Sequence, residues 1–207
     1  MPDLHYEILH GCEAGKIICG VDEVGRGPLA GPVLAAAAIL PREGLPPDIA
    51  ARIRDSKQLS EKQREALFPI LTELCCHAVA EASVAEIGQL NILHASMLAM
   101  RRAVEALGTK PDWALIDGNR APKLDCPATP IVKGDAKSLS IAIAAIIAKV
   151  TRDRLMKQLA EQHPGYGWER NAGYGTAEHL AALREQGPTI WHRDGFAPVA
   201  QARLASK

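Results

Sequence analysis

Apolar runs and turn-forming residues alternate along the first third of the chain. The run at residues 17–22 predicts a buried strand, which the glycine- and proline-rich stretch 25–32 interrupts. Residues 33–40 predict a second strand despite their alanines, because glycine and proline close the run on both sides. Further strands are predicted at residues 77–84, 113–117 and 129–132.

Helices are predicted where apolar positions recur at intervals of three and four residues. Ser60 is suited to cap a helix that runs to about Leu74, with Glu61 in its first turn. Three more helices are predicted: at residues 91–107, from Ser138 or Ser140 to residue 159, and from Thr176 to about Gln186.

This order of elements predicts an α/β fold with a mixed β-sheet flanked by helices. The glycine-rich tract at 165–175 suggests a hinge. It predicts a main domain over residues 1–165 and a small C-terminal helical region over 166–207, although the two could form one continuous domain.

Composition excludes few classes of protein. The 207 residues are 47% hydrophobic and 23% charged, which is typical of a globular chain. The 24 Lys plus Arg balance 24 Asp plus Glu, whereas a protein that coats nucleic acid is usually basic. A basic strip beside an acidic metal pocket would also give a net charge of zero.

The five cysteines form no CxxC pair, so a reduced chain without a zinc site is expected. The N-terminus lacks the pattern of an export signal, and residues 33–40 are too few to span a bilayer. We therefore expect a cytoplasmic, monomeric protein with no membrane contact.

Four acidic residues follow or end predicted strands: Asp22, Glu23, Asp117 and Asp135. Carboxylates are the ligands that Mg²⁺ and Mn²⁺ prefer. Two such ions can activate a water and stabilise the leaving oxygen in phosphodiester cleavage. The alternative is that these acids only solvate turns, which is a weaker explanation for all four together than for any one.

Asp22 and Glu23 are adjacent, and successive side chains of a regular strand point to opposite faces. A shared pocket therefore requires the strand to end, bulge or twist at Glu23, and Gly25 and Gly27 make this feasible. The same tract, GVDEVGRGPLAG, is not a dinucleotide fingerprint, because Pro28 and Pro32 intervene and a strand follows.

Six strings of the sequence resemble the ribonuclease HII (type 2 RNase H) family. They are CGVDEVGRGPLAGPV, DSKQLSEKQRE, IDGN, VKGDAKSLSIAIAAIIAKVTRDR, HPGYGW and NAGYGTAEH. The resemblance extends from about Ile17 to Val199, so it covers nearly the whole chain.

The resemblance implies an RNase H-like fold and a metal-dependent endoribonuclease that uses Mg²⁺ or Mn²⁺. The expected substrates are RNA–DNA hybrids and duplex DNA that contains single ribonucleotides. The enzyme would cut on the 5′ side of the ribonucleotide, leave a 3′-hydroxyl and a 5′-phosphate, and serve ribonucleotide removal from DNA. The family's catalytic metal ligands correspond to Asp22, Glu23, Asp117 and Asp135.

The family's Gly-Arg-Gly motif corresponds to Gly25, Arg26 and Gly27, and its junction-sensing tyrosine to Tyr174. The glycines would let the backbone approach a ribose, whose 2′-hydroxyl distinguishes RNA from DNA. Arg26 could contact the neighbouring phosphate, and Tyr174 could stack on the deoxyribose that follows. The alternative for the motif is a plain glycine turn.

Lys57 and Lys149 are candidate phosphate contacts. Arg152 shares a helix face with Lys149 and could act likewise or could simply be solvated. Tyr166 and Trp168 are expected to pack the C-terminal helices rather than to bind substrate.

Two departures from the family pattern are expected to affect substrate binding. Ala145 stands where a serine is common, and Asp194 and Gly195 replace an Arg-Ser pair before Phe196. No clamp-binding box is evident. The alternatives are a related nuclease of the same fold, such as ribonuclease HIII, and a non-catalytic hybrid-binding module.

Overall fold

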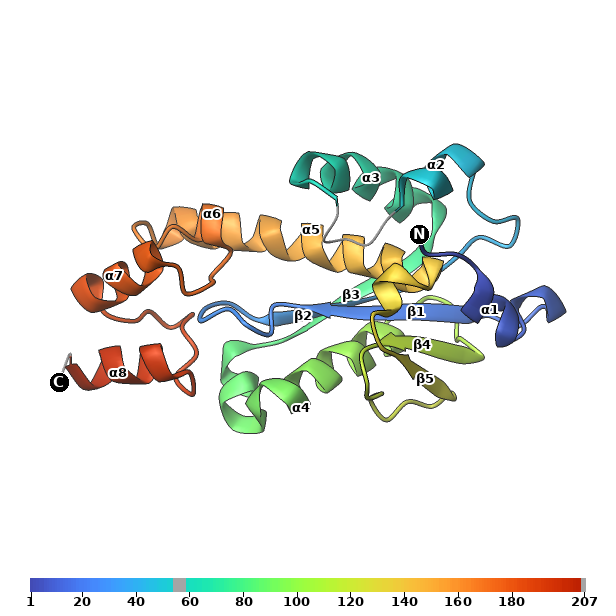
Figure 1. The fold of residues 1–207 in the computed structure, drawn as a ribbon. Coiled ribbons are helices and arrows are strands. Elements are labelled where there is room, and N and C mark those ends of the chain that lie inside the picture. Colours follow the sequence, from blue (N-terminus) through green and yellow to red (C-terminus); the bar gives the residue numbers. More distant parts are fainter. Residues whose placement is uncertain (54–58, 206–207) are drawn as a thin grey trace. The chain divides into compact units, whose positions relative to one another are not determined.

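The computed structural model describes residues 1–53 and 59–205 (Figure 1). Its strands form one sheet with the order β3-β2-β1-β4-β5. The strands are β1 (Ile18–Val24), β2 (Val33–Ile39), β3 (Cys76–Ala82), β4 (Trp113–Asp117) and β5 (Ala128–Ile131). Strand β1 pairs antiparallel with β2 and parallel with β4, and β4 pairs parallel with β5. The predicted mixed sheet is therefore confirmed.

Eight α-helices and two short 3₁₀ helices complete the described chain. The α-helices are α1 (His5–Leu9), α2 (Pro47–Arg52), α3 (Glu61–Leu74), α4 (Val84–Glu105), α5 (Leu139–Gln162), α6 (Trp168–Asn171), α7 (Ala177–Gln186) and α8 (Ala197–Ala205). The 3₁₀ helices are η1 (Cys12–Ala14) and η3 (Gly134–Ala136).

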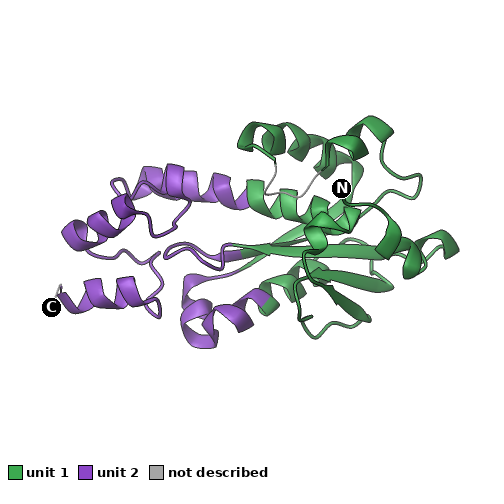
Figure 2. Cartoon of the chain, in the orientation of Figure 1, with its two compact units in different colours: residues 1–24, 34–81, 97–150 green, residues 25–33, 82–96, 151–207 purple. Residues whose placement is uncertain are grey.

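The chain divides into two compact units (Figure 2). The first, here called the sheet unit, holds residues 1–24, 34–81 and 97–150. The second, here called the helical unit, holds residues 25–33, 82–96 and 151–207. The boundary expected after residue 165 falls inside the helical unit, and the division into a catalytic domain and a C-terminal region stays a prediction.

Helices cover both faces of the sheet within the sheet unit (Figure 1). Helices α2, α3 and the first half of α5 pack with β2 in one apolar cluster. Residues 97–105 of α4 lie on the opposite face (Figure 1). Their buried Ala99, Met100 and Ala103 are among the described core residues.

The start of α5 lies directly against β1. A Cβ atom added to Gly20 would come within 2.2 Å of the backbone nitrogen of Ile141 and of the carbonyl carbon of Ser140. Only glycine allows this approach, because backbone atoms cannot move aside as a flexible side chain can. The alanines of β2 and α5 serve the same close packing, since Ala36, Ala38 and Ala144 are fully buried.

A buried carboxylate holds the first turn of α5. Glu7 is 1% exposed, and its Oε1 accepts hydrogen bonds from Ser138 Oγ at 2.7 Å, Ser140 N at 2.9 Å and Ser140 Oγ at 2.7 Å. The backbone N–H groups of a first helical turn lack partners within the helix, so a carboxylate at this point stabilises the helix start. Both serines named as alternative helix starts therefore take part.

The predicted cap at Ser60 is confirmed, and the helix predicted from Thr176 is capped there as well. The Ser60 side chain accepts from Gln63 N, and Gln63 Oε1 in turn accepts from Ser60 N, which completes a capping box. The Thr176 side chain accepts from His179 N at the start of α7. Such caps are visible in the sequence because both partners lie within one turn.

The helix predicted from residue 91 begins earlier, at Val84, with a kink at Asn91. Asn91 has φ 66°, and its Oδ1 accepts hydrogen bonds from the N–H groups of Leu93 and His94. Asn91 therefore caps the second part of α4, as an asparagine at a helix start does. The part before it was missed, and the predicted strand at 77–84 ends instead at Ala82.

Helices α1, α2, α6 and α8 were not predicted, whereas the helix predicted from Thr176 ends at Gln186 as expected. The first three have no side-chain cap hydrogen bond, so the local signal for a helix start is missing.

Over the described ranges, every helix is too short or too polar to cross a bilayer.

We predict that Gly20→Ala lowers the free energy of unfolding by at least about 3 kcal/mol, because the new methyl group overlaps backbone atoms of α5. Gly88→Ala is the matched control. It lies in α4 with no heavy atom within 4 Å of an added Cβ, and the higher helix propensity of alanine should stabilise the chain by about 0.5–1 kcal/mol. Urea titrations of both variants check the prediction, and a Gly20→Ala protein as stable as the wild type would contradict it.

Candidate functional site

Two of the candidate acids lie where the pairing of two neighbouring parallel strands of the sheet unit stops. Strands β1 and β4 are in register from Ile18 opposite Trp113 to Val21 opposite Ile116. The next residues of the two strands are Asp22 and Asp117, so the register brings them side by side with side chains on the same face of the sheet. Asp22 is 8% exposed, and Asp117 is half-buried.

Asp135 is connected to the same place through the backbone of η3. The N–H of Gly134 donates to Asp117 Oδ1 at 2.6 Å. A Cβ atom at Gly134 would lie 3.2 Å from that oxygen and 2.7 Å from Ile141 Cδ1, so the site favours glycine there. Asp135 follows immediately and is 2% exposed. Three segments distant in the sequence therefore place acids at one end of the sheet.

Of the three alternatives expected at Glu23, an end or a bulge of the strand is wrong, and a local twist stays a prediction. The pairing of β1 with β2 continues without interruption through Glu23 opposite Ala35 and Val24 opposite Leu34, so the strand neither ends nor bulges there. What ends is the pairing of β1 with β4, whose last pair involves Val21. The Glu23 N–H donates to Asp22 Oδ1 at 2.7 Å, which orients the Asp22 carboxylate.

The other three candidate acids lie close enough to Asp22 to act on its charge. Burial raises the pKa of the Asp22 carboxyl well above its usual range, and the negative charges of Glu23, Asp117 and Asp135 raise that pKa further. Carboxylates held this close repel one another, and a divalent cation relieves the repulsion.

The donor chemistry of this cluster fits Mg²⁺ or Mn²⁺, because all four side chains offer carboxylate oxygens. In the described part of the chain, no three His, Cys, Asp or Glu side chains are already arranged around a single point where a metal ion could sit. One oxygen each of Asp22 and Asp117 accepts from a backbone N–H.

The Gly-Arg-Gly segment belongs to the helical unit and lies next to Tyr174. Gly25 has φ +95°, and a Cβ there would lie 2.2 Å from Arg152 Nε. A Cβ on Gly27 would lie 3.2 Å from Tyr174 Cε1. The Tyr174 side chain is 46% exposed, so its ring is accessible beside the glycine. The structure thus brings together the motif and the tyrosine that the sequence analysis singled out.

Arg152 is neither solvated nor available to a phosphate, which corrects both interpretations offered from the sequence. It is fully buried, and its guanidinium donates to the carbonyl oxygens of Pro32, Ala172 and Ala30 at 3.2, 2.9 and 3.0 Å. Arg193, to which the sequence analysis gave no role, is also buried and donates to carbonyls of residues 25–32. No local pattern distinguishes such buried arginines from surface ones.

Burial lowers the pKa of Arg152 to about 10 and that of Arg193 to about 9. The positive charge of Arg152 lowers the pKa of Arg193 further. Both guanidinium groups therefore stay protonated at neutral pH and remain full hydrogen-bond donors.

The expected packing role of Tyr166 and Trp168 is confirmed. They are 4% and 1% exposed, and their rings stack at a centroid distance of 5.1 Å. Of the candidate phosphate contacts, Lys57 lies outside the described residues. Lys149 is half-buried on α5, and its role stays a prediction.

Two buried histidines beside these rings form a chain of hydrogen bonds in the helical unit. The Thr189 N–H donates to His192 Nδ1 at 2.9 Å, so His192 carries its proton on Nε2. That nitrogen lies 3.0 Å from His179 Nε2, and the Nδ1 of His179 lies 2.9 Å from the Tyr174 carbonyl oxygen. The geometry therefore suits two neutral rings with assigned tautomers.

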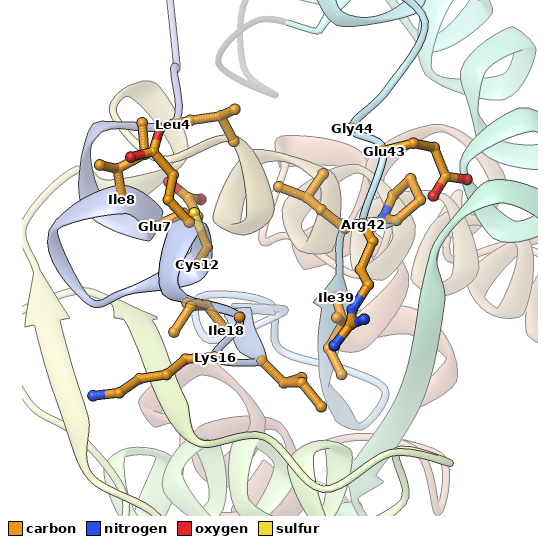
Figure 3. A pocket seen from close by; sticks show the side chains of 15 residues that line it. Leu4, Glu7, Ile8, Cys12, Lys16, Ile18, Ile39, Arg42, Glu43 and Gly44 are labelled. Carbon is orange, nitrogen blue, oxygen red and sulfur yellow. The ribbon is translucent and has the colours of Figure 1, made fainter.

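A pocket of about 320 Å³ lies elsewhere in the sheet unit (Figure 3). It is lined by α1, η1, the start of β1 and residues 39–44, and most of its lining side chains are aliphatic. Ile18 lines this pocket, whereas Asp22 lies four residues further along β1, which corresponds to roughly 13 Å. None of the four candidate acids lines the pocket.

Comparison with known proteins agrees with this geometry. The family model described as Ribonuclease HII matches residues 19–198. A ribonuclease HII of Paramagnetospirillum magneticum is 56% identical over 99% of this chain and 100% of its own length.

Two solved structures share the fold. The ribonuclease H2 from Pyrococcus horikoshii OT3 has a TM-score of 0.75 and 25% identity, and the match covers 91% of this chain and 97% of that one. Bst-RNase HIII in complex with Mn²⁺ has a TM-score of 0.69 and 22% identity, over 93% of this chain and 70% of that one.

A mixed sheet flanked by helices, with acids at the ends of its central strands, defines an RNase H-like protein. The chain belongs to the ribonuclease HII family. It is an enzyme, an endonuclease of the ribonuclease H type.

We predict that acid destabilises the protein partly through His192. Burial lowers the pKa of His192 to about 3, and the charges of His179, Arg203 and His163 contribute to the shift. Between pH 3 and 6.5 the unfolded chain binds a proton that the folded chain does not, so stability falls as the pH falls, by up to about 1.4 kcal/mol per pH unit.

Urea unfolding at several pH values between 7.5 and 5 measures this slope. His192→Asn should flatten the slope, whereas His5→Asn at an exposed position should leave it unchanged. An identical slope in wild type and His192→Asn would contradict the assignment.

Proposed function

We propose that this enzyme hydrolyses the RNA strand of RNA–DNA hybrids and cuts on the 5′ side of single ribonucleotides embedded in duplex DNA. The products would carry a 3′-hydroxyl and a 5′-phosphate, and the reaction would serve ribonucleotide removal from DNA. One observation carries the proposal: Asp22 and Asp117 directly follow the last paired residues of two in-register parallel strands, and Asp117 is hydrogen-bonded to the backbone beside Asp135.

In this proposal Asp22, Glu23, Asp117 and Asp135 would hold two divalent cations, Mg²⁺ or Mn²⁺. When bound, such ions supply Lewis acidity for the attacking water and the leaving oxygen of a phosphodiester. The carboxylate cluster itself supports this role, because its mutual repulsion favours cation binding. The Mn²⁺ complex of the similar ribonuclease HIII also supports it.

The residues of the chain orient these ligands. The Glu23 N–H holds one Asp22 oxygen, and the Gly134 N–H holds one Asp117 oxygen. Each carboxylate has two oxygens, so a hydrogen bond to one of them directs the other without removing it as a ligand. The low exposure of Asp22 and Asp135 limits the water that competes for the cluster.

Recognition of the ribonucleotide is assigned to the Gly-Arg-Gly segment and Tyr174. Gly25 and Gly27 would let the backbone approach the 2′-hydroxyl, and Arg26, which is exposed, would contact a phosphate. The ring of Tyr174 lies beside Gly27 and is accessible, so it could stack on the sugar that follows the ribonucleotide. Lys57 and Lys149 are the further proposed phosphate contacts.

We predict that Asp22→Asn or Asp135→Asn lowers the cleavage rate of a duplex with one ribonucleotide on the order of 10³-fold or more. The loss of a charged ligand removes several kcal/mol of transition-state stabilisation, and each 1.4 kcal/mol is about tenfold. Asp48→Asn, which changes an exposed acid of α2, is the control and should cleave normally. Gel assays with Mg²⁺ and with Mn²⁺ give the rates, and full turnover in either site variant would remove that acid from the proposed site.

We predict that Tyr174→Ala impairs cleavage at a single ribonucleotide at least about tenfold more than cleavage of a long RNA–DNA hybrid. Stacking is worth about 1–3 kcal/mol, and only the single-ribonucleotide substrate always presents a deoxyribose at the junction. Tyr174→Phe keeps the ring and should keep the preference. Equal losses on both substrates would refute a junction-sensing role.

A further inference from the structure

Two arginines of the helical unit are buried to an unusual degree. Arg152 is 0% exposed and Arg193 is 1% exposed. Removing a guanidinium group from water costs several kcal/mol unless its N–H groups find acceptors, so such residues need a compensating set of partners. In both cases the partners are backbone carbonyl oxygens, and all but that of Ala172 belong to residues 25–32.

The side chain of Arg193 uses its whole hydrogen-bonding capacity on residues 25–32. A guanidinium has five N–H donors in a planar fork. Nε donates to the carbonyl of Gly31 at 2.8 Å, Nη1 to those of Pro28 at 2.7 Å and Arg26 at 3.1 Å, and Nη2 to those of Gly25 at 2.6 Å and Pro32 at 3.2 Å. One side chain therefore sets the direction of five peptide groups.

The orientation of these carbonyls also sets the orientation of the amides that follow them. No cis peptide bond occurs in the described chain, and in a trans peptide the N–H points opposite to the C=O. Because the carbonyls of Gly25 and Arg26 point toward buried Arg193, the N–H groups of Arg26 and Gly27 point the other way. Both of these residues are exposed.

Arg152 connects the same segment to the tyrosine. Its guanidinium donates to the carbonyls of Ala30 and Pro32 in the segment and to that of Ala172, two residues before Tyr174. The backbone of the segment also donates directly, from Leu29 N to the Gly173 carbonyl at 2.8 Å. The segment and Tyr174 are therefore held as one assembly.

We infer that Arg193 is a positioning residue for ribonucleotide recognition. It pulls the carbonyls of the Gly-Arg-Gly segment inward and so aims the amide donors of Arg26 and Gly27 outward at the ribonucleotide, at its 2′-hydroxyl oxygen or the adjoining phosphate. The buried positive charge adds to the positive ends of these peptide dipoles. The inference rests on the proposed function, because it explains how the proposed recognition segment keeps its shape.

Lysine cannot replace arginine in this arrangement. A lysine ammonium keeps the charge but has three donors on one atom, so it cannot satisfy five carbonyls spread around a planar fork. Arg193→Lys therefore keeps the buried positive charge but removes most of the hydrogen bonds that give the segment its shape.

The test uses the full chain with Asp22→Asn, which should bind substrate without cutting it. Fluorescence anisotropy in Mg²⁺ compares a duplex with one ribonucleotide against the all-DNA duplex of the same sequence. Adding Arg193→Lys should lower the affinity ratio of the two duplexes about tenfold, since misdirecting one or two amide hydrogen bonds costs about 1.4 kcal/mol. Affinity for the all-DNA duplex should change less than about threefold.

The ratio separates positioning from a merely structural role, because a smaller folded fraction weakens both affinities equally. Arg184→Lys, at an exposed position of α7, is the matched control and should leave the ratio unchanged. An unchanged ratio in folded Arg193→Lys would overturn the inference. If the Asp22→Asn parent itself showed no preference for the ribonucleotide, the proposed function would fail first.

A second measurement serves if Arg193→Lys does not fold. In ¹⁵N-labelled Asp22→Asn protein, the amide resonances of Arg26 and Gly27 should shift more with the ribonucleotide duplex than with the all-DNA duplex. Equal shifts of these two amides with both duplexes would overturn the inference without any change at Arg193.

Discussion

The convergence of four carboxylates from three segments is the constraint on which the proposed site in the sheet unit depends. The parallel register of β1 and β4 places Asp22 beside Asp117, and the Gly134 N–H joins Asp117 to the segment that carries Asp135. Burial, and then the charges of the three neighbouring acids, raise the pKa of Asp22. The start of α5 packs against β1 at Gly20, two residues before Asp22.

The helical unit buries positive charges instead of negative ones. There two buried cations, Arg152 and Arg193, are stabilised by backbone carbonyls rather than by neighbouring acids alone. Carbonyl acceptors fix a loop as firmly as a second strand would, because each guanidinium donor has a defined direction. An irregular segment such as 25–32 can therefore keep a defined shape without regular secondary structure.

Much of the fold could be predicted because its signals are local. The closing glycines and prolines marked β2, and the Ser60 and Thr176 side chains marked the starts of α3 and α7. The short helices α1 and α6 were missed, since neither has a side-chain cap and tertiary packing stabilises them. The four acids could be named from the sequence because each follows or ends a strand, and the family resemblance singled out the same positions.

By itself, the sequence determined the presence of the strands, the acids near their ends and the glycines that allow close backbone approach, because these depend on neighbouring residues. Only the tertiary structure decided that β1 stays regular through Glu23, and that Arg152 and Arg193 turn inward. The physical reason is distance along the chain: Arg193 is 168 residues from the Gly25 carbonyl that it binds. A buried arginine and a solvated one look alike until folding brings such acceptors into reach.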